Sequence, residues 1–338
     1  MTVVLEEMIA RLPTSLQRDV QLGLEHLLEA CSPEQRAAYE SLLADEHWVA
    51  ALLQLFAGSQ FCAQQARRHP DWLLTLQQSG DLDRSLASEI WPQRLSSFGH
   101  TPQSVDALDK KLRDFRNREY LRILWRDFNR RCTMPETTAD ITRVAEVCIQ
   151  VALDFHDTAL RIEFGNPVSA LDGSAQTLVV LGMGKLGARE LNLSSDIDLI
   201  FSYPAAGETV GAARSIHNQE YFSHLGKRVI SSLDRLTSDG FVFRVDMRLR
   251  PYGDSGALVL NFDAMEEYYQ DQGRDWERYA MIKARVVAGD EKAGARLLEI
   301  LRPFTYRRYL DFSAFESLRE MKRLIQREVR RRKLFEVR

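Results

Sequence analysis

The chain has 338 residues, and its 45 lysines and arginines against 48 aspartates and glutamates give a formal net charge of −3. This balance argues against a protein that holds nucleic acid mainly through bulk positive charge. A hydrophobic content of 45% is typical of a globular protein and not of a disordered one, and the length suggests two or three domains.

The cysteines and the first residues indicate the compartment. Cys31, Cys62, Cys132 and Cys148 form no CxxC pair, so we expect reduced thiols rather than a zinc site or a disulfide framework. The start, MTVVLEEMIARLP, lacks the basic residues and apolar core of a signal peptide, and no stretch reaches the roughly 18 uncharged apolar residues of a membrane span. We therefore expect a cytoplasmic protein without a membrane or nucleic-acid partner.

Residues 5 to 161 show helical spacing of apolar side chains almost throughout. Ser32-Pro33 and His69-Pro70 are typical of positions where one helix ends and the next begins. Over 118–129, arginines alternate with aromatic and aliphatic residues. They predict the solvated face of an amphipathic helix, with contact to a partner protein as the alternative.

The pattern changes at 166–175, where Gly, Pro, Asp and Ser predict a loop or linker. Short apolar, β-branched runs then predict four strands, at 177–182, 197–203, 241–247 and 257–262. A long helix is expected between the second and third strands, at roughly 212–236. From residue 264 onward the pattern is helical again.

These elements predict a predominantly helical α+β fold with three parts. An N-terminal helical region (1–165) and a C-terminal helical region (264–338) flank a core with a small mixed sheet (166–263). The last segment, REVRRRKLFEVR, is a charged helix without a C-cap signal, so we expect the chain to be a fragment of a longer protein.

Gly182, Gly184 and Gly187 match the GxGxxG pattern after a predicted strand, which on its own suggests a dinucleotide site. The residues that follow the glycines disfavour a dinucleotide site. The segment after Gly187 is too short for a full crossover helix, and two aspartates arrive early and as a pair rather than one acid about 20 residues on.

Asp196 and Asp198 lie two residues apart at the start of a predicted strand, so both side chains point to the same face. Two carboxylates held this close repel each other unless a cation lies between them. Oxygen ligands of this kind favour Mg²⁺ or Mn²⁺ completed by phosphate oxygens from a substrate. The alternative is a solvated strand end with two exposed acids.

A third carboxylate favours the metal site. Asp246 alternates with Arg244, Arg248 and Arg250 along the predicted strand 241–247 and its continuation, opposite an apolar face. One acid among three arginines suits a site that binds both metal and phosphate. Three carboxylates from two strands are able to hold two metals for an in-line displacement at phosphorus.

A glycine-bearing turn, a short helix, a D-hydrophobic-D strand and a later acidic strand together resemble the nucleotidyltransferase fold of the DNA polymerase β type. Gly184 precedes Asp196 at a spacing typical of that superfamily. Lys185 is a departure, because many members have serine there. Ser194 and Ser195 could supply hydroxyl groups to the phosphates instead.

Three segments resemble a narrower family, the bifunctional glutamine synthetase adenylyltransferase/adenylyl-removing enzymes of bacteria. They are GMGKLGARELNLSSDIDLIFSY, RVDMRLRPYGDSGALVL and GRDWERYAMIKAR. The resemblance extends from about residue 172 to the end and is fainter in the N-terminal helices. Members carry two nucleotidyltransferase units in tandem, and this chain is most similar to the first, adenylyl-removing one.

The resemblance implies a reaction and a set of site residues. The first unit removes AMP from a tyrosine of glutamine synthetase by phosphorolysis, which gives ADP and the active synthetase, and uridylylated PII signalling protein promotes the reaction. Asp196, Asp198 and Asp246 would be the catalytic metal ligands for Mg²⁺ or Mn²⁺. The predicted phosphate- and nucleotide-binding residues are Gly184, Lys185, Ser194, Ser195, Arg248 and Arg250, with Arg274, Lys283 and Arg285 near the site.

Two alternatives stay open at this point. The same residues would serve the reverse reaction, in which AMP is transferred from ATP to glutamine synthetase. A regulatory docking module with a degenerate site is the other, suggested by the helical N-terminal region; the three intact aspartates argue against it.

Overall fold

A computed structural model describes residues 3–237 and 239–306, together with residues 316, 319, 320, 322–324, 326, 327 and 331. Most of the predicted basic segment at the C-terminus lies outside the described residues. The chain forms two compact units. The first comprises residues up to Cys148 with Glu190–Leu193 and Leu236–Val242; the second comprises Ile149–Arg189, Ser194–Arg235 and the residues from Phe243 onward. The domain boundaries expected from the sequence stay predictions.

The described part of the first unit is helical, as predicted. Its helices are α1 (Val3–Ala10), α2 (Thr14–Ala30), α3 (Pro33–Leu42), α4 (Glu46–Gly58), α5 (Gln60–Arg68), α6 (Pro70–Gln78), η1 (Ser88–Ile90), α7 (Trp91–Ser97), α8 (Val105–Phe128) and the first part of α9 (Met134–Phe164). The structure explains two of the expected helix boundaries. Ser32 forms a capping box with Gln35 ahead of Pro33, and Pro70 opens α6 after His69.

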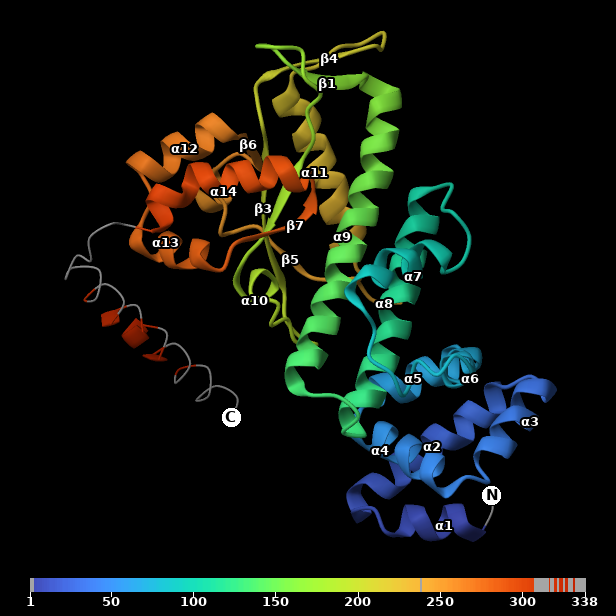
Figure 1. Cartoon of the computed structure of the whole chain (residues 1–338). Helices are drawn as coiled ribbons and strands as arrows, with labels where there is room; N and C mark the ends of the chain where they lie inside the picture. Colours follow the sequence, from blue (N-terminus) through green and yellow to red (C-terminus); the bar gives the residue numbers. More distant parts are fainter. Residues whose placement is uncertain are drawn as a thin grey trace. The chain divides into compact units, whose positions relative to one another are not determined.

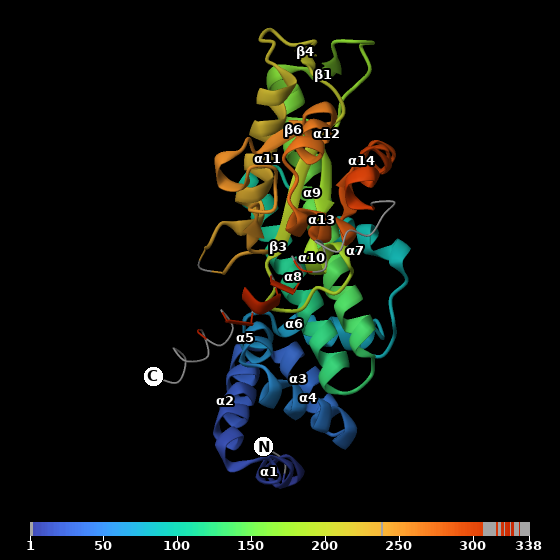
Figure 2. The same ribbon diagram turned by 90° about the vertical axis from the view of Figure 1, so that its left-hand side faces the viewer.

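An apolar core joins the helices of the first unit, and Figure 2 shows α2 to α6 lying close together. Its large members include Trp48 and Trp125, whose rings lie 5.7 Å apart. Tyr39 is fully buried, and its hydroxyl donates a hydrogen bond of 2.7 Å to the Pro70 carbonyl. Burying each large apolar side chain contributes about 1.5–3 kcal/mol, so this cluster accounts for much of the unit's stability.

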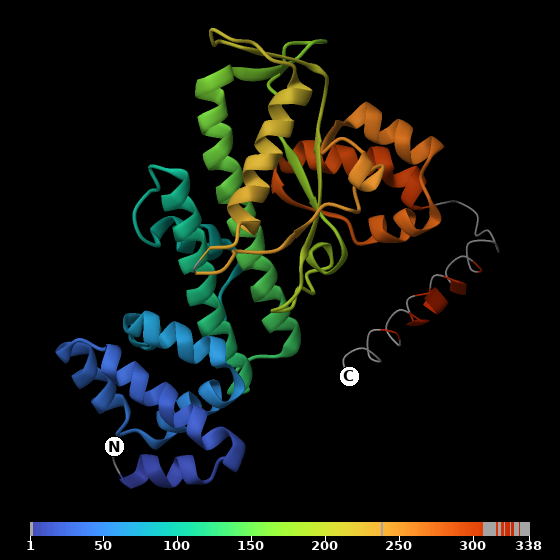
Figure 3. The same ribbon diagram turned by 180° about the vertical axis from the view of Figure 1, so that it is seen from behind.

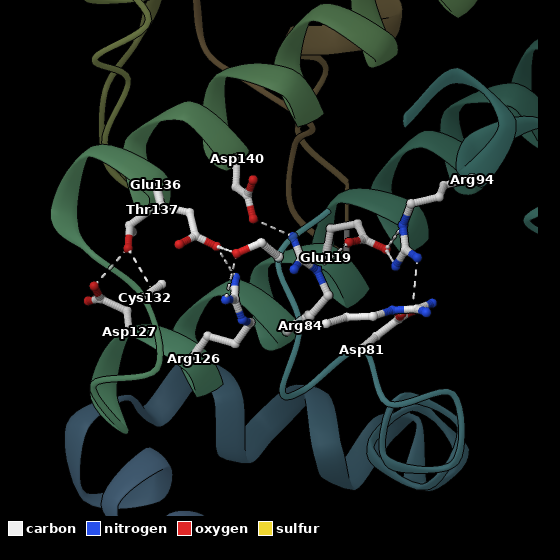
Figure 4. Close-up of polar contacts among 12 residues, drawn as sticks. Asp81, Arg84, Arg94, Glu119, Arg126, Asp127, Cys132, Glu136, Thr137 and Asp140 are labelled. Carbon is white, nitrogen blue, oxygen red and sulfur yellow. Dashed lines mark hydrogen bonds and ion pairs between the residues drawn. The ribbon is translucent and has the colours of Figure 1, made fainter. Parts of the chain in front are cut away.

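The arginines of α8 do not form the solvated face that the sequence predicted. Arg122 is fully buried, and Arg126 is 2% exposed. Arg122 binds Glu119 at 2.9 Å on its own helix and Asp140 of α9 at 2.5 Å. Figure 4 shows Arg126 of α8 beside Glu136 of α9, a second ion pair between the two helices. The arginines are buried because each meets a carboxylate, which a hydrophobic pattern does not reveal.

The second unit contains a mixed five-stranded sheet with the order β5-β3-β2-β7, with β6 also paired to β3 (Figure 1). The strands are β2 (Val179–Gly182), β3 (Ile197–Tyr203), β5 (Val245–Asp246), β6 (Val259–Asn261) and β7 (Arg285–Gly289); β1 (Asn166–Ser169) and β4 (Gly207–Val210) form a separate antiparallel pair. The remaining elements are the second part of α9, α10 (Gly184–Gly187), α11 (Asn218–Asp234), η2 (Gly253–Ser255), α12 (Phe262–Asp271), α13 (Asp275–Ile282) and α14 (Glu291–Thr305). The predicted α+β class with a small mixed sheet is thus confirmed.

Both faces of this sheet are covered, and Figure 3 shows α11 on one side of β3 with α12 and α14 on the other. Val179, Leu181 and Ile200 pack against α12 and α14. On the other face, Phe201 packs so closely against α11 that a Cβ at Gly226 would lie 2.9 Å from its ring. The central strands β2 and β3 are therefore buried on both sides, which explains their continuous apolar runs.

The connection from β2 to β3 decides against the dinucleotide interpretation of GxGxxG. The two strands are antiparallel, whereas a dinucleotide-binding unit needs parallel strands joined by a crossover helix. Between them lies only the four-residue helix α10. None of the described helices is long and apolar enough to span a membrane.

Candidate active site

The three predicted aspartates lie on neighbouring strands. Asp196 immediately precedes β3, Asp198 is its second residue, and Asp246 ends β5. Strands β3 and β5 are parallel, and Asp198 lies opposite Asp246 in the register. Ile197 and Leu199 are fully buried between and beyond the two aspartates of β3, so the alternation expected from the sequence holds here.

The environment of Asp198 raises the pKa of its carboxyl group. Burial contributes most, followed by the negative charges of Asp246 and Asp196. Asp246 is affected in the opposite direction, because hydrogen bonds from Arg248 lower its pKa. A divalent cation would reduce the repulsion between these neighbouring carboxylates. Carboxylate oxygens are the ligands that Mg²⁺ prefers. The three carboxylates are therefore of the chemical type that the expected metal binds.

Two arginines bind the outer aspartates. Arg244 donates from Nε to the Asp196 carboxylate and from its guanidinium to the Ser194 carbonyl at 2.8 Å. Arg248 makes a two-pronged contact with Asp246, at 2.9 Å from Nε and 2.5 Å from the terminal nitrogen. Over the ranges that the structure describes, no three His, Cys, Asp or Glu side chains form a complete ligand cluster. In this arrangement Asp196 and Asp246 are paired with arginines and are not gathered with Asp198 into one ligand set.

In the turn after β2, the backbone at Gly184 lies close to the Asp198 side chain. Gly184 has φ of +52°, and a Cβ there would lie 3.1 Å from the Asp198 Oδ2 atom. Glycine is needed both for this conformation and for this close approach. In the next position, the Lys185 ammonium donates to the Ser195 hydroxyl at 3.3 Å. The predicted phosphate-binding residues of the two segments are therefore neighbours.

Not every predicted basic residue has its side chain directed at the aspartates. The Arg250 side chain is 11% exposed and donates to the Met247 carbonyl at 2.8 Å. Arg285 donates to the carbonyls of Leu186 and Gly187, both at 3.1 Å, at the end of α10. Lys283 packs its backbone carbonyl where a Cβ of Gly187 would be, 1.9 Å away. These contacts hold the glycine turn in place. Arg274 lines a cavity with Arg248, described below.

Comparison with known proteins identifies the family. The family model described as glutamate-ammonia ligase adenylyltransferase matches residues 49–300. The chain belongs to this family.

Its relatives are similar across most of the chain. The bifunctional glutamine synthetase adenylyltransferase/adenylyl-removing enzyme of Pseudomonas putida is 56% identical over 283 residues, which is 84% of this chain and 29% of the relative. The enzyme of the same name from Pseudomonas aeruginosa is 51% identical over 332 residues, 97% of this chain and 34% of the relative. The chain thus spans about a third of the length of the curated relatives it matches.

Some residues of this family member's site were not predicted from the sequence. Arg244 was predicted among the three arginines beside Asp246 but not as a phosphate-binding residue, and the structure shows that it binds Asp196. Its position two residues before Asp246 was the available signal. Trp276 and Tyr252 line the cavity beside Arg248, and their solvent exposure is visible only in the structure.

Proposed function

We propose that the chain removes AMP from an adenylylated tyrosine of glutamine synthetase by metal-dependent phosphorolysis, giving ADP and the unmodified synthetase. The observation that carries this is the pairing of Asp198 with Asp246 across β3 and β5, with Asp196 adjacent, in a chain of this family. The segment GRDWERYAMIKAR, which resembles the adenylyl-removing unit, favours removal over addition of AMP.

In the proposed reaction an oxygen of inorganic phosphate attacks the α-phosphorus. A phosphorus–oxygen bond to the phosphate forms as the bond to the tyrosine oxygen breaks, and the phenolate takes a proton from solvent. Phosphate is a competent nucleophile near neutral pH, so no general base is required. Mg²⁺ or Mn²⁺, held by Asp196, Asp198 and Asp246, would neutralise charge on the phosphates and on the leaving oxygen.

The protein's own residues bind and orient the reacting groups. Arg248 and Lys185 are placed to bind phosphate oxygens, since their cationic ends lie at exposed contacts with Asp246 and Ser195. Ser194 and Ser195 precede Asp196 and add hydroxyl donors. Arg250 and Arg285 act through the backbone carbonyls that they bind, so we assign them to positioning.

The decisive experiment incubates the chain with adenylylated glutamine synthetase, inorganic phosphate and Mg²⁺, and measures ADP by chromatography. We expect ADP that depends on phosphate, with stimulation by the uridylylated PII protein. Asp196→Asn and Asp198→Asn should lower the rate by at least about 10²- to 10³-fold, while Asp263→Asn, an exposed aspartate at the start of α12, should not.

The outcome also separates the alternatives. Transfer of labelled AMP from ATP onto unmodified synthetase, without phosphate-dependent ADP, would indicate the reverse reaction. Absence of both activities with adenylylated synthetase and PII present would contradict the proposal.

A further inference from the structure

A cavity of about 270 Å³ lies next to Arg248 in the second unit. Its walls come from the loop around η2, the end of α12 and the start of α13. They include Arg248, Tyr252, Tyr268, Gln272, Arg274 and Trp276. Arg248 connects the cavity to the candidate active site, because the same side chain binds Asp246. The cavity is therefore adjacent to the proposed phosphate positions.

One wall of this cavity is aromatic and held in place. The rings of Tyr252 and Tyr268 lie 4.5 Å apart in an edge-to-face arrangement. The Tyr268 hydroxyl donates to Glu277 Oε1 at 2.6 Å, and Glu277 Oε2 accepts a hydrogen bond of 2.8 Å from the Arg274 backbone N–H. Glu277 is 3% exposed, so a buried carboxylate fixes both Tyr268 and the start of α13.

Two aromatic side chains of the cavity are exposed. Trp276 is 38% exposed, whereas the other four tryptophans, all described, are at most 5% exposed. Tyr252 is 52% exposed and has φ of +60°, a conformation uncommon for a residue other than glycine. Such strain costs free energy and is found mostly where a site needs it.

We propose that this cavity binds the adenine base of the nucleotide whose phosphates bind beside Arg248. The inference rests on the proposed function, because that function supplies the nucleotide. An aromatic face stacks on any nucleobase, and arginines at the rim attract its phosphates. The volume is near the lower end of small-molecule pockets, about 300 Å³, which suits a base and not a segment of folded protein.

Gln272 gives the cavity a basis for preferring adenine. Its amide carries one acceptor and one donor, the pair that binds the N6 amino group and N7 of adenine. Guanine presents an oxygen where adenine has its amino group, so the acceptor of Gln272 would meet another acceptor. We assign Gln272 to base selection and Trp276 to stacking.

The first test is calorimetry of ADP binding with Mg²⁺ to the whole chain. Trp276→Leu should weaken ADP binding about 10-fold, and Trp276→Phe, which keeps an aromatic face, less than about 3-fold. Tyr306→Leu, at an exposed aromatic outside the cavity, should leave the affinity unchanged. Ribose 5-phosphate, which has no base, should bind equally to the wild type and to Trp276→Leu. Unchanged ADP affinity in Trp276→Leu would overturn the proposal.

A second measurement uses Trp276 as its own reporter. AMP should protect the exposed tryptophan emission from acrylamide quenching, and Gln272→Leu should reduce the preference for AMP over GMP about 5-fold. Protection by N-acetyl-tyrosinamide but not by AMP would show that the cavity holds the substrate tyrosine and would refute a base site.

The two proposals fail separately. Nucleotide binding that depends on Trp276 without phosphate-dependent ADP formation would support the base site and contradict the proposed reaction. Phosphate-dependent ADP formation, together with an ADP affinity that Trp276→Leu leaves unchanged, would support the proposed reaction and contradict the base site.

Discussion

Gly184 couples the backbone of the turn to the chemistry of Asp198. Its φ of +52° is costly for any residue with a Cβ, and that Cβ would lie 3.1 Å from the carboxylate oxygen. We expect Gly184→Ala to lower phosphorolysis strongly, because Asp198 must move, and to lower the free energy of unfolding by about 1–2 kcal/mol. Activity assays and urea unfolding measure the two effects.

Gly173 provides the matched control for this substitution. It has φ of +69°, and a Cβ there would meet no atom within 4 Å. Gly173→Ala should therefore have a similar cost in stability and retain activity. Equal activity losses in both variants would mean that backbone strain, rather than displacement of Asp198, explains the effect.

At the same scale, the sequence predicted the aspartates better than the arginines. Strand alternation was enough to place Asp196 and Asp198 on one face. Arg250 and Arg285 donate to backbone carbonyls, contacts that no residue pattern marks, although Arg250 also pairs with Asp254 four residues later. The burial of Arg122 depends on Glu119 three residues before it and on Asp140 in the next helix, so it follows from tertiary packing.

Buried ion pairs join α8 to α7 through Glu119 and Arg94, and to the first part of α9 through Arg122 and Asp140. Glu119, fully buried, accepts from Arg94 at 2.5 Å and from Arg122 at 2.9 Å. Removing it in Glu119→Ala leaves three arginines, Arg94, Arg118 and Arg122, without this carboxylate, so we expect a loss of about 3–5 kcal/mol in unfolding free energy. The first unit contains four of the tryptophans, so tryptophan fluorescence in urea reports its unfolding; they are Trp48, Trp72, Trp91 and Trp125.

The comparison for this variant lies on the same helix. Lys110 and Asp114 form an ion pair whose lysine side chain is 63% exposed, and Asp114→Ala should cost less than about 1 kcal/mol. A loss of that small size in Glu119→Ala would contradict the importance of the buried pairs.

Asp81, in the turn directly after α6, makes the stability of the first unit sensitive to acid. Burial alone would raise the pKa of its carboxyl group, but Arg94 and Arg84 together lower it. A lowered pKa in the folded state means that the stabilisation is present above about pH 4, the unfolded value, and is lost as the pH falls below it. The stability difference between the wild type and Asp81→Asn should therefore shrink between pH 7 and pH 3.

Urea unfolding followed by tryptophan fluorescence at both pH values checks this. Asp19→Asn, at an exposed aspartate of α2, serves as the control and should show a difference that changes little. If the stability difference between the wild type and Asp81→Asn grows on acidification, the pKa of Asp81 is not lowered in the folded state.

At the scale of elements, the sequence identified the strands whose apolar runs are buried on both faces. β3 has the predicted bounds, 197–203, and β2 lies within 177–182. The predicted strand 241–247 is reduced to Val245–Asp246, and the expected alternation fails before it, where Val242 and Phe243 are both buried. β7 was missed inside a region of helical pattern, since it pairs with β2, more than 100 residues earlier in the sequence.

For the whole molecule, the balance of charge argues against binding of nucleic acid through bulk positive charge. The totals of 45 basic and 48 acidic residues leave no excess of positive charge, and the arginines beside the aspartates, Arg244 and Arg248, already bind carboxylates. Non-specific binding to DNA depends on releasing counterions with unpaired positive charge, and where present it has a Kd of about 10⁻⁴–10⁻⁶ M. We therefore expect no shift of a short DNA duplex at about 10 μM chain and physiological salt. Under the same conditions we expect the chain still to bind nucleotide in the cavity that Trp276 lines. A salt-sensitive shift of the duplex would show that a basic surface outside these arginines governs binding.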